Sequence, residues 1–164
     1  MTSMVMPNDT NGLGNLMGGK LLHEMDMCAA IVAQRHANRV CVTASVDTVE
    51  FRGPIRQGEV VIIKGFINRA FTSSMEIELR VWAENPREDT RRRCNTAYYT
   101  FVGVDEEGDP AVVPSVRPED PEEKERFEAA GRRRELRLLM AGRMKPDDAS
   151  NLTDYLEAAM GTPQ

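Results

Sequence analysis

The sequence is poor in the residues that mark several classes of protein. Its three cysteines, at positions 28, 41 and 94, form no CxxC pair and are odd in number, which excludes a disulfide framework and a zinc-finger ligand set. There are two histidines but no HExxH motif, and GxSxG is also absent, so the signatures of zincin metalloproteases and of α/β-hydrolases are missing. We therefore expect reduced thiols, a cytoplasmic location and no metal site.

Long apolar runs and an excess of basic charge are missing too. No apolar run approaches the roughly 18–20 residues of a membrane helix, so we expect no membrane insertion. The first seven residues have neither the basic nor the apolar region of a signal peptide. The net charge of −5 disfavours nucleic acid as a partner, because phosphate backbones need a basic field, but a small anionic ligand could still bind a local cluster of bases. What the 164 residues do contain, 41% hydrophobic and 29% charged, is typical of a globular protein with a sizeable core.

One long helix followed by a run of strands accounts for most of the apolar residues. About residues 18–37, apolar side chains recur at helical spacing on one face: Leu21, Leu22, Met25, Cys28, Ala29, Val32 and Ala33. About residues 40–104 contain four expected strands separated by Gly and Pro turns, and residues 75–82 alternate strictly between apolar and polar. Because helices do not alternate with strands, the pattern predicts an α+β fold, in which a curved antiparallel sheet wraps around one central helix.

The first strand and the C-terminal part depart from this regular pattern. Valines alternate with polar residues from Val40 to Val46, and the phase then changes, which predicts a β-bulge or bend near Thr48. From about Pro118 the chain is highly charged, and it predicts a solvated helix with Phe127, Leu136, Leu138, Leu139 and Met140 as anchors. We therefore expect a domain over residues 1–117 and a helical extension over 118–164.

Asp26 is the first candidate for chemistry, because it is the only acid in the apolar part of the predicted helix. A buried carboxylate costs free energy unless it is paired or used, so it is a candidate general base or nucleophile. The alternative is a structural Asp that hydrogen-bonds to a neighbouring strand, and periodicity does not separate the two.

The glycine-rich loop before the helix is the second candidate. Residues 11–19 place glycines and Asn15 where free N–H groups and the helix dipole favour a phosphate or the oxyanion of an acyl-transfer intermediate. Asn15 could equally be a helix cap. A dinucleotide site is disfavoured, since Met17 stands where GxGxxG needs glycine and no strand precedes the loop.

The spacing of Asn15 and Asp26 bears on how they could act together. Eleven positions separate them, which corresponds to roughly 16 Å along a helix. One chain cannot bring both to one reacting centre. If they act together they come from two subunits, with the helices antiparallel across a two-fold axis and two equal composite sites.

Several motifs resemble those of hotdog-fold acyl-CoA thioesterases, which include bacterial YciA-type enzymes and the cytosolic brain-type acyl-CoA hydrolase. The similar stretches are MPNDTN at 6–11, GNLMGG at 14–19, MD at 25–26, VTASVD at 42–47, SSMEIE at 73–78 and PEEKERFE at 121–128. The resemblance implies hydrolysis of acyl-CoA to a free acid and CoA without a cofactor, by a homodimer that commonly assembles as a trimer of dimers.

The resemblance also implies roles for individual residues. Asp26 of one subunit would be the base or nucleophile, and Asn15 of the other would act with the helix N-terminal amides of Gly18 and Gly19, which stabilise the oxyanion. The CoA arm would meet a turn and a nearby base, namely Lys64, Arg69, Thr72, Ser73 and Ser74. As a bare pattern, this turn is more typical of Ser/Thr capping before a strand.

One other function remains open at this point, and a third is disfavoured by the sequence. The chain could be a hotdog protein without catalysis that binds acyl-CoA as a sensor or scaffold. A hotdog dehydratase acting on an acyl thioester would prefer a catalytic histidine near the helix, and neither His23, on its polar face, nor His36, at its far end, matches.

Overall fold

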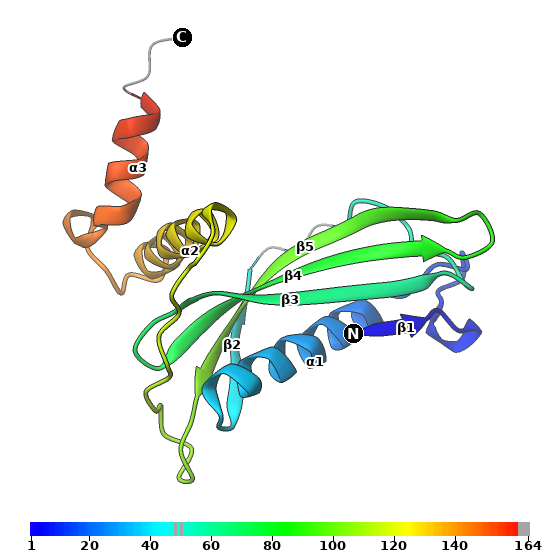
Figure 1. Cartoon of the computed structure of the whole chain (residues 1–164), viewed down its shortest axis with the longest axis horizontal. Helices are drawn as coiled ribbons and strands as arrows, with labels where there is room; N and C mark the ends of the chain where they lie inside the picture. Colours follow the sequence, from blue (N-terminus) through cyan, green and yellow to red (C-terminus); the bar gives the residue numbers. More distant parts are fainter. Residues whose placement is uncertain (48, 50, 161–164) are drawn as a thin grey trace. The chain divides into compact units, whose positions relative to one another are not determined.

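The computed structural model describes residues 1–47, 49 and 51–160, and the chain divides into two compact units, Met1–Ser115 and Val116–Gln164. The first unit contains five strands and one long helix (Figure 1): β1 (Thr2–Met4), α1 (Gly18–Ala37), β2 (Cys41–Val46), β3 (Val60–Ala70), β4 (Ser74–Asn85) and β5 (Thr90–Gly103). The second unit contains α2 (Pro121–Met140) and α3 (Ser150–Met160). Short 3-10 helices span Pro7–Asp9 and Pro146–Asp148.

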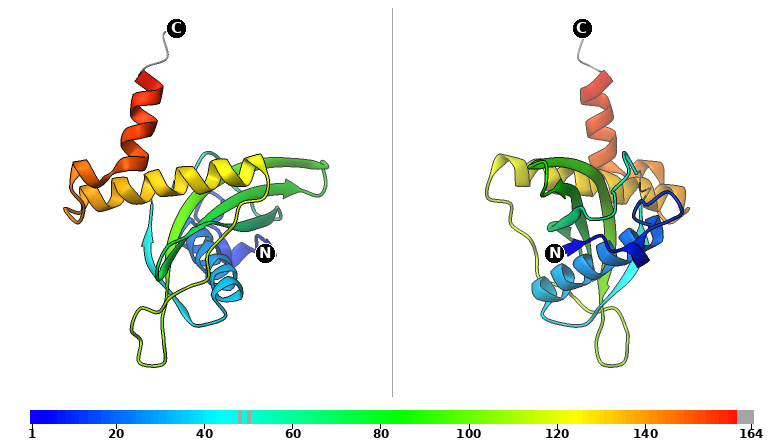
Figure 2. Two further views of the ribbon diagram at one scale, coloured as in Figure 1. Left: turned by 60° about the vertical axis from the view of Figure 1, so that its left-hand side comes forward. Right: turned by 90° about the vertical axis from the view of Figure 1, so that its right-hand side faces the viewer.

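The five strands form one antiparallel sheet in the order β1-β3-β4-β5-β2. The sheet is curved, and α1 lies across its concave face (Figures 1 and 2). The predicted α+β class and the predicted helix are confirmed. The sequence pattern missed β1, because its three residues are too few to show alternation; they pair with β3 from Thr2 opposite Ile62 to Met4 opposite Val60.

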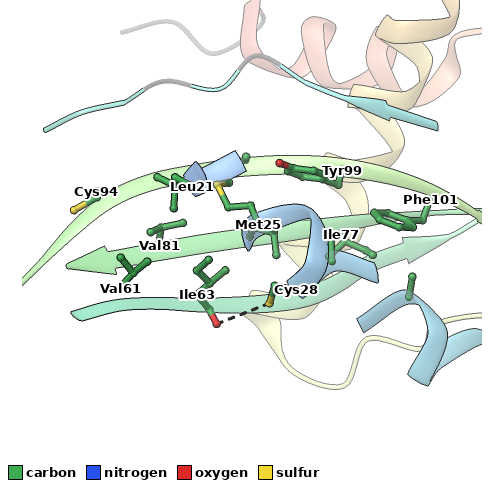
Figure 3. Close-up of a cluster of buried hydrophobic side chains, with 14 of the residues drawn as sticks. Leu21, Met25, Cys28, Val61, Ile63, Ile77, Val81, Cys94, Tyr99 and Phe101 are labelled. Atoms are coloured by element: carbon green, nitrogen blue, oxygen red, sulfur yellow. Dashed lines mark hydrogen bonds between the residues drawn. The ribbon is translucent and has the colours of Figure 1, made fainter. Parts of the chain in front are cut away.

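The hydrophobic core fills the space between α1 and the sheet (Figure 3). The apolar face of β4 is completely buried, as its alternation predicts, and it packs with the sheet-facing side of α1 and with Tyr99 and Phe101 of β5. Full burial of one such side chain contributes about 1.5–3 kcal/mol. At Gly65 of β3 an added Cβ would lie only 2.8 Å from Val32 Cγ2, so glycine permits the close approach of α1.

Two strands differ from the predicted pattern. In β2, Cys41 is buried, whereas Val42 and Val46 are 47% and 44% exposed, because β2 is an edge strand whose valines do not face this core. The register between β2 and β5 shifts between Thr43 and Ser45. The bulge predicted near Thr48 lies outside the described residues. In β4 the acidic face is buried as well, with Glu78 paired to Arg80 at 2.6 Å.

The C-terminal unit is a pair of helices joined by a buried acid. Asp120 caps α2 by accepting the Glu123 N–H at 2.8 Å. Glu135 of α2 is 6% exposed and accepts the Leu152 N–H at 2.8 Å, so its charge lies at the N-terminus of α3. Of the anchors predicted for α2, Leu136 and Met140 are exposed, at 47% and 82%. Among the described residues, no helix combines the length and hydropathy needed to cross a membrane.

Candidate functional site

The loop that leads into α1 is held by hydrogen bonds within itself. The Asn11 Oδ1 atom accepts the Leu13 and Asn15 N–H groups at 3.0 and 3.2 Å, and the Asn11 N–H donates to the Asn15 carbonyl at 2.8 Å. The Met17 N–H donates to the Asp9 carbonyl at 2.9 Å. These bonds bring the MPNDTN and GNLMGG segments together and fix both asparagines relative to the start of the helix.

The start of α1 presents backbone amides that the helix itself does not use. The N-cap residue is Met17, and it makes no side-chain capping bond, so the interpretation of Asn15 as a helix cap is wrong. The Leu21 N–H donates to the Met17 carbonyl at 3.1 Å. The amides of Gly18 and Gly19 therefore precede the helical hydrogen-bond ladder, and they carry the positive end of the helix dipole.

A cavity of about 400 Å³ lies at this helix start. Gly18 lines it together with both asparagines of the loop, whereas Gly19 is exposed and lies outside the lining. An added Cβ on Gly18 would lie 3.4 Å from the Phe51 ring, so the ring packs directly over the glycine. Most of the remaining wall is apolar: Leu16, Leu21, Phe51, Pro54, Ile55 and Cys94.

The sheet completes this cavity through a bulge in β5. Asn95 pairs with Val81, but Arg93 pairs with Trp82, so Cys94 is an extra residue in the strand. As a result Cys94 and Asn95 are adjacent and both buried, and both line the cavity. Burial raises the pKa of the Cys94 thiol, which keeps it protonated. Sequence alternation gave no sign of either residue, because a bulge interrupts the period on which that signal depends.

Asp26 lies further along α1, half-buried, beside β2. Its Oδ1 atom accepts a hydrogen bond from the Thr43 hydroxyl at 2.7 Å. The buried Tyr99 is close enough to be affected: desolvation, and then the charge of Asp26, raise the Tyr99 pKa to about 12. Asp26 thus does bridge to a neighbouring strand, and the carboxylate is held in a fixed position.

The structure separates the predicted site residues into two groups. Asn15 and Gly18 lie at the end of the sheet where Asn95 pairs with Val81, and Asp26 does not line the cavity there. Thr43, the partner of Asp26, lies at the other end: it pairs with Phe101, which pairs with Met75. Met75 is six residues from Val81 on β4, which corresponds to roughly 20 Å along the strand. Asp26 and the helix start are therefore not brought to one centre within a single chain.

The residues predicted to bind the CoA arm lie either near Asp26 and Thr43 or midway between them and the helix start. Ser74 pairs with Val102, which also pairs with Val42 of β2, so the turn between β3 and β4 lies near the end of the sheet where Thr43 contacts Asp26. Thr72 and Ser73 occupy that turn, and the Arg69 guanidinium stacks on the Phe71 ring at 5.5 Å. Lys64 is exposed in the middle of β3, with its Nζ atom 5.5 Å from the Trp82 ring.

Comparison with known proteins agrees with this architecture. The profile of the Thioesterase superfamily matches residues 13–90. A Bacillus subtilis protein, described as an uncharacterized acyl-CoA thioester hydrolase, is 43% identical over 122 residues, which are 74% of this chain and 71% of that protein. The rat cytosolic acyl coenzyme A thioester hydrolase is 37% identical over 146 residues; these are 87% of this chain but only 38% of the rat protein.

Solved structures give the same result. An apo-hexameric acyl-CoA thioesterase superposes with a TM-score of 0.83 at 40% identity, covering 86% of this chain and 90% of that one. The acyl-CoA hydrolase of Staphylococcus aureus, in complex with butyryl-CoA and CoA, gives a TM-score of 0.80 at 34% identity, covering 95% and 92%. Alanine variants of that hydrolase replace an asparagine, an aspartate and a threonine that lie 15 and then 17 positions apart.

These matches extend over most of the chain and include the curved sheet, the central helix and the loop before it. The chain therefore belongs to the thioesterase superfamily, among the hotdog-fold acyl-CoA thioester hydrolases.

Proposed function

We propose that this protein hydrolyses acyl-CoA at composite sites, each built from the helix start of one subunit and Asp26 of another. The observation that carries the proposal is the Thr43–Asp26 hydrogen bond. The three residues varied in the S. aureus hydrolase have counterparts of the same type here, namely Asn11, Asp26 and Thr43. Their separations, 15 and 17 positions, are also the same. The spacing therefore supports Asp26 as the reacting carboxylate and Thr43 as the residue that positions it.

The same spacing adds a second candidate for the catalytic asparagine. Asn15 is the residue expected from the sequence, but it is Asn11 that lies 15 positions before Asp26. Both side chains line the cavity at the helix start. The side-chain oxygen of Asn11, Oδ1, accepts two backbone N–H groups. Its NH2 group is the remaining donor of the side chain, and it could donate to a substrate carbonyl. Single alanine variants of each asparagine decide between them.

Exposed apolar side chains support a dimer as the catalytic unit. Met27 and Ile31 of α1 are 48% and 42% exposed, and Val42 and Val46 of the edge strand β2 are similarly exposed. An apolar edge strand is a surface that soluble proteins normally cover. Pairing of two subunits through this surface, with their helices antiparallel, would bring Asp26 of one towards the helix start of the other. Trimers of such dimers would give the hexamer named for the relatives.

In the proposed mechanism the thioester carbonyl lies at the Gly18 and Gly19 amides, which stabilise the negative charge that develops on its oxygen. Asp26 of the other subunit takes a proton from water, and the resulting hydroxide bonds to the carbonyl carbon. The C–S bond then breaks, and CoA leaves as a thiolate that takes up a proton. Alternatively Asp26 attacks the carbon directly, giving an anhydride that water cleaves. In both routes the Thr43 hydroxyl, which donates to the Asp26 Oδ1 atom, orients the carboxylate.

The CoA arm is assigned to the subunit that supplies Asp26. Ser73 and Ser74 lie at the same end of the sheet as Thr43, so they suit the part of the substrate that extends away from the scissile bond. Arg69, Thr72 and Lys64 would add hydrogen bonds to the amide and hydroxyl groups of its pantetheine part.

The test is CoA release, followed with a thiol reagent, on acetyl-, hexanoyl- and palmitoyl-CoA. Asp26→Ala should lower kcat by about 10²–10⁴-fold, the usual contribution of a general base, while the oligomer persists on size exclusion. Glu24→Ala is the matched control, since Glu24 is on the same helix and also accepts a hydroxyl, that of Ser3, at 2.6 Å. Retained activity in Asp26→Ala contradicts the assignment. Absence of turnover in the wild type, together with tight acyl-CoA binding, would favour the non-catalytic sensor.

Mixed oligomers test whether the sites are composite. An Asn11→Ala/Asn15→Ala double variant and Asp26→Ala are each expected to be inactive. Random pairing of the two in co-expressed dimers should restore about a quarter of the sites, because one site of each heterodimer receives both intact groups. If the mixture stays inactive while heterodimers are present, the two groups act within one chain.

A further inference from the structure

A second cavity adjoins the one at the helix start, with Pro54 in the lining of both. Its volume is about 690 Å³, within the range of sites for small ligands and cofactors. Its wall is polar and basic rather than apolar, and it comes from the segment before β3 and the turn between β4 and β5: Pro54, Arg56, Gln57, Gly58, Glu59, Asn85, Arg87, Glu88 and Arg92.

An ion pair between the buried carboxylate of Glu59 and the partly exposed guanidinium of Arg92 lies in the lining of this cavity. Glu59 is 6% exposed, and its two carboxylate oxygens accept the two guanidinium NH2 groups of Arg92 at 2.6 and 2.7 Å. Arg92 also donates to the Pro54 carbonyl, and Glu59 accepts the Arg56 N–H at 2.6 Å. The hydrogen bond from Arg92 is the main reason that the pKa of Glu59 is lowered. Both charges are therefore fixed, and they neutralise each other.

Two further arginines, Arg56 and Arg87, line the cavity, and within the described part of the chain neither forms an ion pair of the kind that joins Arg92 to Glu59. Among the residues that the structure describes, no side-chain ion pair or hydrogen bond involves the guanidinium of Arg56 or of Arg87. The backbone at both positions is held, since Arg56 pairs with Asn15 and the Arg87 N–H donates to the Asn85 side chain at 3.1 Å. Glu88 is the single remaining acid of the lining. The wall is thus positive overall, in a chain whose net charge is −5.

We propose that this cavity binds the phosphate groups of a nucleotide, with Arg56 and Arg87 as the phosphate ligands and the Glu59–Arg92 pair as their support. Planar guanidinium groups bind phosphate oxygens in pairs, and the cavity has room for the rest of a nucleotide. The phosphates can come from two sources. One is the nucleotide end of an acyl-CoA bound at the composite site, which rests on the proposed function; the other is a free nucleotide, which does not.

The experiment uses the full-length oligomer and an Arg56→Gln/Arg87→Gln double variant. Arg91→Gln is the control, because the Arg91 guanidinium stacks on Trp82 at 5.1 Å on the same strand as Arg92 but does not line the cavity. Calorimetry measures the binding of 3′,5′-ADP and of ADP. Steady-state kinetics compare hexanoyl-CoA with hexanoyl-pantetheine, which has the same reacting bond but no nucleotide. Thermal melting checks that both variants are folded.

If CoA supplies the phosphates, the double variant should raise the KM for hexanoyl-CoA about tenfold or more, with kcat and the kinetics of hexanoyl-pantetheine unchanged. If a free nucleotide supplies them, ADP binding is lost and neither KM changes. The proposal is overturned if the wild type binds neither nucleotide and the KM values are unaffected, or if Arg91→Gln causes an equal loss. If neither thioester is hydrolysed, the proposed function fails, while calorimetry still decides whether the nucleotide site exists.

Discussion

Met25 and Met27 are two positions apart on α1, and they have opposite environments. Met25 is fully buried against the sheet, whereas Met27 is 48% exposed on the outer side of the helix, as is Ile31 about one turn later. Asp26 lies between them, with its carboxylate bound to Thr43. The comparison teaches that one side of this helix builds the domain, while the rest of its surface carries the Asp26 carboxylate, which we propose as the reacting group, and exposed apolar side chains suited to a second subunit.

The largest effect on stability is expected on the sheet-facing side. Met25→Ala should lower the free energy of unfolding by about 2–5 kcal/mol, because it removes a fully buried side chain and leaves a cavity beneath the helix. Denaturant unfolding measures the loss. The activity of the fraction that remains folded should be nearly normal. A cost below about 1 kcal/mol would mean that this side of the helix is less tightly packed than its burial indicates.

A charge on the outer side should affect assembly rather than folding. Val42→Asp places a carboxylate in the exposed apolar strip of β2, and we expect the dissociation constant of the dimer to rise at least about tenfold. Light scattering across a concentration series measures this change. Activity should fall in parallel with the fraction of dimer, since each proposed site needs two subunits. Full activity in a monomeric variant would contradict the composite site.

Between the two sides, the Thr43–Asp26 contact should affect catalysis alone. Thr43→Ala removes one hydrogen bond to a charged group, worth about 1.5–3 kcal/mol, so kcat should fall by roughly 10–100-fold while KM changes little. Thr43→Ser keeps the hydroxyl and should restore most of the rate, which a purely steric role of the threonine would not predict.

The smallest effect is expected at the exposed methionine. In the Val42→Asp background, where subunits are separated, Met27→Ala should change the free energy of unfolding by less than about 0.5 kcal/mol. In the otherwise wild-type oligomer the same substitution should weaken assembly. If Met27→Ala destabilises the separated subunit as strongly as Met25→Ala does, the division of the helix into two functional sides is wrong.

The elements that the sequence predicted well are those in which local periodicity and one-sided burial coincide. Residues 18–37 form the helix as predicted, and β4 buries its apolar face. The prediction failed where the outcome depends on neighbours. The valines of β2 alternate as in a buried strand, yet they lie at the sheet edge and are exposed. β1 is defined only by its pairing with β3.

The candidate site divides in the same way. Asp26 was identifiable because an acid within an apolar helix is conspicuous in the sequence alone, and its catalytic role and that of Asn15 remain predictions. Thr43 could not be identified as its partner, since the contact depends on how the sheet curves around the helix. Arg56, Arg87 and Arg92 come from two separate connections, and no spacing in the sequence indicates that they line one cavity.

Cys94, the extra residue in β5, affects both cavities because it determines which face of the sheet the residues before it point to. Counted back from Asn95 without the bulge, Arg92 would stand opposite Glu84, on the face of the sheet that points away from the core. With Cys94 inserted, Arg92 stands opposite Ala83 and meets Glu59. A single residue therefore both places Cys94 and Asn95 in the wall at the helix start and turns the supporting arginine of the neighbouring cavity inward. A change in strand length at this point would reshape the walls of both cavities together.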